Sequence, residues 1–328
     1  MGLKSNVLNK LEEAKGSFIS GEFLAGQLSV SRTAVWKAVK SLVREGHIID
    51  SVPNQGYKLT PASNVISNEG ILAEISKLGG CAALKHAIVL KSVGSTNTFA
   101  KQLIASGESN VTLIVSEEQT GGRGRLGREF TSPKGGLYFS LILPDGLKAQ
   151  SPGLITTAVS LSVCRSLAKL TPYSPQIKWV NDVFLHGKKI CGILTEGVTD
   201  LETGSLLSVI IGVGINYCEP QNGFPYELKN IAASIFPRGE TPTCSANALC
   251  ASVVTDLLSH VSNGNFQTDI AEYKRFSLVL GKTVTFTQNG TQLSGKAVDI
   301  DDRGGLIVET DGGLLTLNSG EISINLLK

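Results

Sequence analysis

Hydrophobic residues in the first sixty positions recur at helical spacing and then alternate as in strands. The helical spacing predicts a first helix with an apolar stripe at Val7, Leu8, Leu11 and Ala14. A second short helix fits residues 21–28. Ser31 is placed to cap a third helix, whose inner face is Val35, Ala38, Val39 and Leu42. Residues 47–52 and 57–59 can pair as strands across a turn at 53–56. Three helices followed by a hairpin predict a winged helix-turn-helix domain over residues 1–62.

The outer face of the third helix carries cations and hydrogen-bond donors. Its candidate DNA-binding residues are Ser31, Arg32, Thr33, Trp36, Lys37 and Lys40. In a helix-turn-helix the first residues of this helix reach base edges in the major groove. A solvated helix face would show the same stripe. The short turn, the polar first turn and the wing together favour DNA.

Residues 65–275 mix strand and helix patterns and predict a central α+β domain. Strand patterns cover residues 87–90, 111–116, 136–143, 177–180 and 206–213. Helical patterns cover residues 67–78, 152–168 and 247–261. The hairpin signal His186-Gly187 indicates a mixed or antiparallel sheet, not a doubly wound one.

Residues 277–328 alternate short strand-like runs with turns at 289–290, 301–305 and 311–313. Short strands at this close spacing predict a small SH3-like β-barrel. The chain is therefore expected to be a multidomain α+β protein, with residues 61–64 as a linker between its first two domains.

Composition narrows the possible functions only slightly. The chain has 328 residues, 41% hydrophobic and 18% charged, which is typical of a globular protein. A net charge of +2 predicts no partner, so nucleic-acid binding would need a local patch. The six cysteines form no Cys-x-x-Cys pair, which favours reduced thiols over a zinc site. No leader or membrane-length apolar run is visible, and we expect a cytoplasmic protein with no membrane partner.

The most informative stretch is residues 117–133, where four glycines alternate with three arginines between two apolar strands. Arg123, Arg125 and Arg128 supply permanently charged, forked donors suited to carboxylates and phosphates. Ordering such a loop costs about 1–2 kcal/mol per residue, so we expect it to be mobile when empty and to close on a bound anion. The spacing matches neither a Walker loop nor a dinucleotide fingerprint. A flexible RNA-binding segment is the alternative, although the loop is short for that role.

Three further motifs are weak when taken singly. Asn181 and Asp182 offer oxygen ligands suited to Mg²⁺, but alone they read as a turn. Lys189 precedes a strand and can reach a site at the end of the sheet, although a lone lysine is more often solvated. Ser95 can cap the helix that follows it, bind a polar ligand, or do both.

Together these motifs resemble those of the biotin protein ligases. The resemblance is specifically to the class that also acts as the biotin operon repressor. The matching stretches, in the order of the family, are 95–97, Gln119, 122–128, 178–182, 189–192, 212–216 and 319–323. The resemblance covers essentially the whole chain. The glycine-arginine loop is its most specific part.

The resemblance implies a role for each matching residue. Biotin would be bound by Ser95, Thr96, Asn97, Gln119, Arg123, Gly124, Arg125 and Lys189. ATP and the adenylate would be bound by Arg125, Arg128, Phe130, Asn181, Asp182, Lys189 and Asn216, with Asp182 also a Mg²⁺ ligand. The residues implied to be catalytic are Arg123, Arg125 and Lys189. Biotin and ATP would react to biotinyl-AMP, which a lysine of a biotin carboxyl carrier domain would attack.

Four positions depart from the family pattern. Leu126 stands where the best-known repressors carry another arginine, and Val180 replaces a common proline. Phe130 replaces a common tryptophan beside the adenine, and Asn325 replaces an arginine near the nucleotide. The loop therefore has one cation fewer, and the contact of the C-terminal domain with ATP is open.

The resemblance also implies that biotinyl-AMP favours a homodimer, whose two winged helices would bind operator DNA and repress biotin genes. Three other interpretations remain at this point. The protein could be a non-catalytic biotin-sensing repressor, a lipoate-type ligase of related fold, or a ligase whose N-terminal domain no longer represses.

Overall fold

The computed structural model describes residues 2–144, 152–200, 202, 204–263, 266–288 and 290–324. These residues form two compact units. The first contains the chain up to Cys81 together with Cys244–Ser252, and the second contains Ala82–Thr243 and the chain from Val253 onward. The predicted domain limits at 62–65 and 275–277 are finer than this division and stay a prediction.

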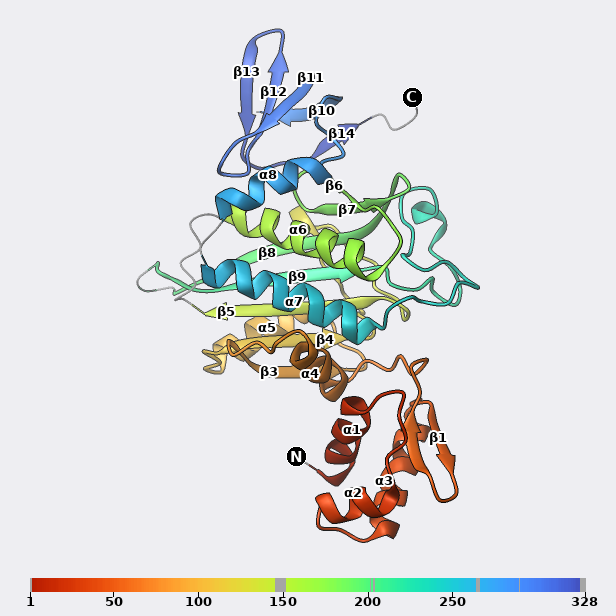
Figure 1. The fold of residues 1–328 in the computed structure, drawn as a ribbon. Coiled ribbons are helices and arrows are strands. Elements are labelled where there is room, and N and C mark those ends of the chain that lie inside the picture. Colours follow the sequence, from red (N-terminus) through yellow and green to blue (C-terminus); the bar gives the residue numbers. More distant parts are fainter. Residues whose placement is uncertain are drawn as a thin grey trace. The chain divides into compact units, whose positions relative to one another are not determined.

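The first unit contains the winged helix-turn-helix that the sequence predicted (Figure 1). Its elements are α1 (Leu3–Glu13), α2 (Gly21–Gln27), α3 (Arg32–Arg44), β1 (Ile49–Val52), β2 (Gly56–Leu59) and α4 (Asn68–Lys77). Strands β1 and β2 form an antiparallel hairpin. The Ser31 side chain caps α3 by accepting a hydrogen bond from the Ala34 amide, as expected.

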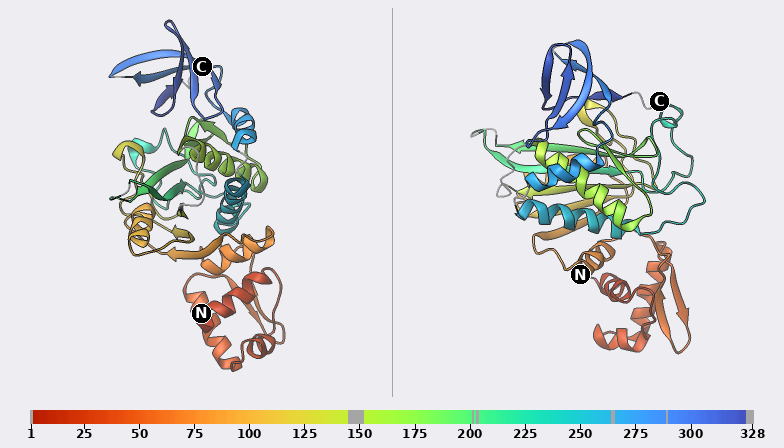
Figure 2. Two further views of the ribbon diagram at one scale, coloured as in Figure 1. Left: turned by 90° about the vertical axis from the view of Figure 1, so that its left-hand side faces the viewer. Right: turned by 45° about the horizontal axis from the view of Figure 1, so that its top comes forward.

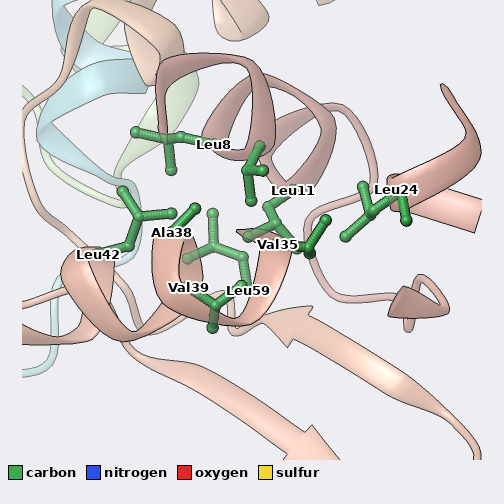
Figure 3. Packing of buried hydrophobic residues seen from close by; sticks show 10 residues of the cluster. Leu8, Leu11, Leu24, Val35, Ala38, Val39, Leu42 and Leu59 are labelled. Carbon is green, nitrogen blue, oxygen red and sulfur yellow. The ribbon is translucent and has the colours of Figure 1, made fainter. Parts of the chain in front are cut away.

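One apolar cluster holds the three helices and the hairpin together (Figure 3). Its buried members include Leu8, Leu11, Leu24, Val35, Ala38, Val39, Leu42 and Leu59. The inner face of α3 is the one predicted from the spacing of its apolar residues. Because that face is buried, the opposite face of α3 is left for solvent or a partner.

The second unit is built on a seven-stranded mixed sheet of order β3-β4-β5-β9-β8-β7-β6. The strands are β3 (Leu84–Leu90), β4 (Val111–Ser116), β5 (Leu137–Pro144), β6 (Gln176–Lys178), β7 (Asp182–Leu185), β8 (Lys188–Thr199) and β9 (Leu206–Ile215). Strands β3 and β4 are parallel, and the other pairs are antiparallel. The mixed sheet is therefore confirmed. His186 and Gly187, both at positive φ, form the predicted β7–β8 turn.

Helices cover both faces of this sheet (Figure 2). On one face α5 (Thr96–Ala105) packs on β4, β5 and β9; on the other α6 (Pro152–Leu170) packs on β7 and β8. Helix α8 (Phe266–Phe276) packs on α6, and α7 (Ala246–Asn263) precedes it in the chain. Burial on both faces explains why β5 and β9 read as continuous apolar runs.

A small β-domain ends the chain. Its strands are β10 (Thr283–Gln288), β11 (Thr291–Ile300), β12 (Leu306–Thr310), β13 (Gly313–Leu317) and β14 (Ile322–Ile324). They pair antiparallel in the order β13-β12-β11-β10-β14, which confirms the small all-β domain. The Trp179 indole donates to the Gly304 carbonyl over 2.9 Å and ties this domain to the central sheet.

All six cysteines are free. No helix within the described ranges is long and apolar enough to cross a bilayer.

Candidate active site

Two adjoining cavities open beside β8, β9 and the glycine-arginine loop. The first is lined by residues 95–97 at the start of α5, by Gln119, and by stretches of β8 and β9. The second is lined by residues 128–130, 178–179, 181–182 and 320–323. Both cavities share the residues Gly124, Arg125, Phe130, Asn181 and Lys189. Residues far apart in the sequence thus meet where one cavity passes into the other.

The floor of the first cavity depends on glycines in the two central strands. Gly192 and Gly214 are cross-strand neighbours, and the Phe130 ring lies directly against both. A Cβ on Gly214 would lie 2.4 Å from the Phe130 ring, and one on Gly192 would lie 2.9 Å from it. Only glycine therefore lets the loop bring this ring onto the sheet.

Residues at the start of α5 form the polar wall of the first cavity. Ser95 caps the helix by accepting a hydrogen bond from the Thr98 amide over 3.4 Å. Thr96 donates to the Gln119 side-chain oxygen from its amide over 2.8 Å and from its hydroxyl over 3.1 Å. The Gln119 amide in turn donates to the Ser132 hydroxyl over 2.9 Å. Thr96, Gln119 and Ser132 therefore form one hydrogen-bonded group, and Ser95 lies beside it at the N-cap of α5.

Asn97 is held by partners on both sides of its side-chain amide. Its oxygen accepts from the Ser140 hydroxyl over 2.6 Å, and its nitrogen donates to a Glu196 oxygen over 2.8 Å. Lys101 donates to the other Glu196 oxygen over 2.7 Å. Burial disfavours the charged form of Glu196, but the hydrogen bonds from Lys101 and Asn97 outweigh it and lower the pKa of Glu196. Sequence reasoning missed Ser140 and Glu196, because nothing local marks them as neighbours of Asn97.

The boundary between the cavities is strongly cationic. Lys189 Nζ lies 2.7 Å from Asp182 Oδ1 and 5.7 Å from the centre of the Phe130 ring. Arg125 Nη1 donates to Asn181 Oδ1 over 3.0 Å. The Asn181 nitrogen donates to the Ile193 carbonyl over 2.9 Å, which fixes the side chain on β8. The Arg125 guanidinium and the Lys189 ammonium thus lie at the same boundary. Together they can bind a ligand that carries two negatively charged groups.

The remaining predicted site residues do not all line the same cavity. Arg123 lines the first cavity and Arg128 the second, where its guanidinium lies 2.6 Å from a Glu321 oxygen. Asn216 is in the lining of neither cavity, because its buried side chain donates to the Ala233 carbonyl over 3.1 Å. Leu126 is 77% exposed with φ 55°. Asn325 lies outside the described residues.

Lys178 also lines the second cavity, and the sequence motif at 178–182 predicts no role for it. Burial lowers its pKa, and the nearby Lys189 and Arg128 act in the same direction, against Asp182 and Glu321. The signal that could have identified it is a lysine one residue before a buried Trp179 at the end of a strand.

The candidate DNA-binding residues belong to the first unit, and all of them are exposed on α3 or at its cap: Ser31, Arg32, Thr33, Trp36, Lys37 and Lys40. Lys40 Nζ lies 5.7 Å from the centre of the Trp36 ring. A large aromatic ring that is half exposed beside cations is available for contact with a partner.

Comparison with known proteins agrees with this architecture. Residues 89–216 match the biotin/lipoate A/B protein ligase family, residues 4–58 match an HTH domain, and residues 279–324 match the biotin protein ligase C-terminal domain. The chain is 31% identical to the bifunctional ligase/repressor BirA of Bacillus subtilis over 98% of both chains. It is 29% identical to BirA of Escherichia coli over 95% of this chain and 94% of that protein.

A solved structure supports the same assignment for the catalytic part. The biotin protein ligase of Aquifex aeolicus, in complex with biotin and ATP, superposes with a TM-score of 0.62 at 30% identity. It covers 74% of this chain and 99% of its own. Fold and site together define a biotin protein ligase with an N-terminal helix-turn-helix domain. The chain belongs to the family of bifunctional biotin ligase/repressors.

Proposed function

We propose that this protein joins biotin to a lysine of a biotin carboxyl carrier domain in two steps, through biotinyl-AMP, and represses transcription when the adenylate is bound. The observation that supports this most directly is the meeting of Arg125 and Lys189 at the boundary shared by two cavities. One cavity suits a small ring system with a carboxylate tail, and the other suits a nucleotide.

Biotin would lie in the first cavity. Its ureido group needs donors and acceptors, which the Ser95 hydroxyl and the hydrogen-bonded pair Thr96 and Gln119 offer in this cavity. Asn97, held by Ser140 and Glu196, would keep the α5 end of the cavity in place. The biotin carboxylate would then point toward Lys189, with Arg123, Gly124 and Arg125 closing over it.

The nucleotide would occupy the second cavity. Phe130 would contact the adenine, and Arg125, Arg128 and Lys189 would bind phosphate oxygens. Asn181 holds Arg125, so it would act on the nucleotide through that guanidinium as well as directly. Asn216 would act indirectly, since it fixes the backbone that continues from β9 through its bond to Ala233.

A Mg²⁺ ion would accompany ATP, and the residues present fit it. Mg²⁺ is commonly held by one or two carboxylates plus substrate phosphates and water. Among the described residues no three His, Cys, Asp or Glu side chains gather as a ready metal cage. Asp182 supplies a single carboxylate in the second cavity and would hold the ion together with the phosphates. When bound, Mg²⁺ would supply charge neutralisation to the triphosphate.

The chemistry follows from these charges. A biotin carboxylate and an ATP α-phosphate repel each other, and Lys189 with the loop arginines cancels that repulsion at the point of contact. Positioning by the two cavities adds to this effect. The mixed anhydride that forms is prone to hydrolysis, and a loop closed over it excludes water until an acceptor lysine attacks and AMP leaves. The chain contributes no covalent intermediate to this scheme.

Repression would use the exposed face of α3. Two copies joined by adenylate binding would present two recognition helices to a two-fold operator. The wing and the α3 cations would contact the DNA backbone. The homodimer would form because the ordered glycine-arginine loop completes its surface. Because ATP, the carrier domain and the operator would all be found there, this activity would take place in the cytoplasm.

One experiment tests the enzymatic half: incubation with ATP, Mg²⁺, biotin and a biotin carboxyl carrier domain, followed by mass spectrometry of the carrier. A biotin-sized mass gain on one lysine is expected. Biotin-dependent exchange of labelled pyrophosphate into ATP tests adenylation separately, and its absence would favour a non-catalytic sensor. Lipoate added in place of biotin tests the lipoate-type alternative, which requires modification with lipoate instead.

The repressor half is tested by a gel shift on the protein's own biotin operon with and without biotinyl-AMP. Retardation that depends on the adenylate is expected. A chain lacking residues 1–62 should keep ligating biotin and lose retardation. If the full chain gives no retardation while ligating normally, the N-terminal domain does not repress.

A further inference from the structure

The second cavity contains a lysine without the partner that its neighbours have. Arg128 lies 2.6 Å from Glu321, and Lys189 lies 2.7 Å from Asp182, so each of these cations faces a carboxylate at contact distance. In the described part of the chain, Lys178 has no ion pair or side-chain hydrogen bond. Its ammonium lies over the Phe184 ring, with 5.9 Å from Nζ to the ring centre.

Lys178 is also fixed in direction by the sheet. It pairs with Asp182 across β6 and β7, and cross-strand partners project from the same face of a sheet. Asp182 lines the same cavity. Its carboxylate is a neighbour of both Lys178 and Lys189, but it forms its ion pair with Lys189. The ammonium of Lys178 is therefore half-buried in the cavity without an ion-pair partner of its own. An anion bound in this cavity would supply the negative charge that the Lys178 ammonium lacks.

The proposed reaction brings such an anion. The biotin carboxylate oxygen bonds to the α-phosphorus, the bond from that phosphorus to the oxygen bridging to the β-phosphorus breaks, and the electron pair leaves with pyrophosphate. Lys189 and Arg125 sit at the boundary between the cavities, where the carboxylate and the α-phosphate would meet. Of these two cavities Lys178 lines the second and not the first, and the rest of the triphosphate would lie on that side under the proposed function.

We propose that Lys178 binds the β- and γ-phosphates of ATP and the pyrophosphate that they become. This assignment rests on the proposed ligase function and gives one residue a task separate from binding the adenylate. Because biotinyl-AMP lacks both phosphates, Lys178 should matter for adenylation and its reversal and be dispensable afterwards.

The test separates the two half-reactions in the full-length protein with its substrates. Lys178→Met removes the charge and keeps the length of the side chain, Lys178→Arg keeps the charge, and Lys169→Met is the control at an exposed lysine on α6. For each variant, the KM values for ATP and inorganic pyrophosphate are measured by biotin-dependent pyrophosphate–ATP exchange. Transfer of biotin from preformed biotinyl-AMP to a carrier domain is measured separately.

Lys178→Met should raise the KM for ATP and for pyrophosphate at least tenfold, while its rate of transfer from preformed biotinyl-AMP stays within twofold of the wild type. Lys178→Arg should recover most of the pyrophosphate affinity, and Lys169→Met should match the wild type. The assignment is overturned if Lys178→Met leaves both KM values unchanged, or if it lowers transfer from preformed adenylate as strongly as exchange. Failure of the wild type to exchange pyrophosphate in the presence of biotin would instead refute the ligase function itself.

Discussion

Arg125 of the glycine-arginine loop donates a 3.0 Å hydrogen bond to the side-chain oxygen of Asn181, fifty-six positions further along the chain. The acceptor is an amide and not a carboxylate, so the loop is anchored while the guanidinium keeps its full charge. The other nitrogen of Asn181 is committed to the Ile193 carbonyl, which leaves the amide in one orientation. The contact therefore positions a cation without neutralising it.

Replacing this amide with a carboxylate of the same shape tests that idea. Asn181→Asp would pair with Arg125 and compete with the phosphate for its charge. Hydrogen bonds involving charged groups contribute about 1.5–3 kcal/mol, so biotinyl-AMP affinity and the rate of adenylation should fall roughly 10- to 100-fold. Isothermal titration with biotinyl-AMP and pyrophosphate exchange measure the two effects. Asn318→Asp, the same charge change at an exposed position, should leave both unchanged, and equal effects in the two variants would contradict the argument.

The packing of Phe130 on Gly214 gives a second test, because a Cβ at Gly214 would lie 2.4 Å from the ring. Gly214→Ala should push Phe130 off the sheet and lower biotin affinity by roughly tenfold or more, as overpacking costs about 1–3 kcal/mol. Removing the ring should relieve the clash, so Gly214→Ala should weaken biotin binding much less in a Phe130→Ala background. Titration of biotin into the four proteins of this cycle measures the coupling.

Gly312→Ala is the matched control, since a Cβ there would meet only Thr310, at 3.7 Å. Its biotin affinity should equal that of the wild type. If the effects of the Gly214 and Phe130 substitutions prove additive, the Phe130 ring does not pack on Gly214.

Much of the fold was accessible from the sequence because its signals are local. The apolar stripe of α3 and its Ser31 cap are fixed by neighbouring residues, and so is the His186-Gly187 turn. The site was recognisable at its glycine-arginine loop, where composition itself implies an anion. What the sequence could not supply is which cation faces which carboxylate. The pairs Lys189–Asp182 and Arg128–Glu321 depend on strand pairing and on contact with the C-terminal domain, and Asn216 lies near the site without lining it.

The exposed face of α3 predicts two kinds of DNA contact. Lys37, a solvent-exposed cation, should bind phosphate. Lys37→Ala should then weaken binding to all sequences alike and reduce the slope of log K against log salt by about 1. Thr33, in the first turn, should read a base edge, so Thr33→Ala should cost about 1–3 kcal/mol at one operator position with the salt slope unchanged. Fluorescence anisotropy on operator and scrambled DNA at several salt concentrations separates the two behaviours.

Ligation kinetics supply the control for both variants. They should remain those of the wild type, because neither residue belongs to the catalytic unit. If Lys37→Ala changed sequence preference and not the salt slope, the assignment of that residue to the DNA backbone would be wrong.

His47 makes the helix-turn-helix domain sensitive to acid. The side chain is buried at 4% exposure, and its Nδ1 has no hydrogen-bond partner among the described residues. Burial lowers the pKa of His47 below its ordinary value of 6.5, with Glu45 acting in the opposite direction. The unfolded chain therefore binds the proton more readily, and stability falls as the pH drops below 6.5 toward the folded pKa. The loss is at most about 1.4 kcal/mol for each pH unit.

Hydrogen exchange of the α3 amides in the full-length protein at pH 7.5 and 5.5, corrected for intrinsic rates, measures this loss. His47→Phe should remove most of the acid sensitivity, because an apolar ring fills the site without titrating. Burial of Glu12 raises the pKa of its carboxyl, so this group favours folding as the pH falls and acts against His47. The His47 contribution is consequently the difference between the wild type and His47→Phe. His86→Phe, at an exposed histidine of the other unit, should leave the acid response of α3 intact. If His47→Phe responded to acid as the wild type does, the sensitivity would have to come from another group.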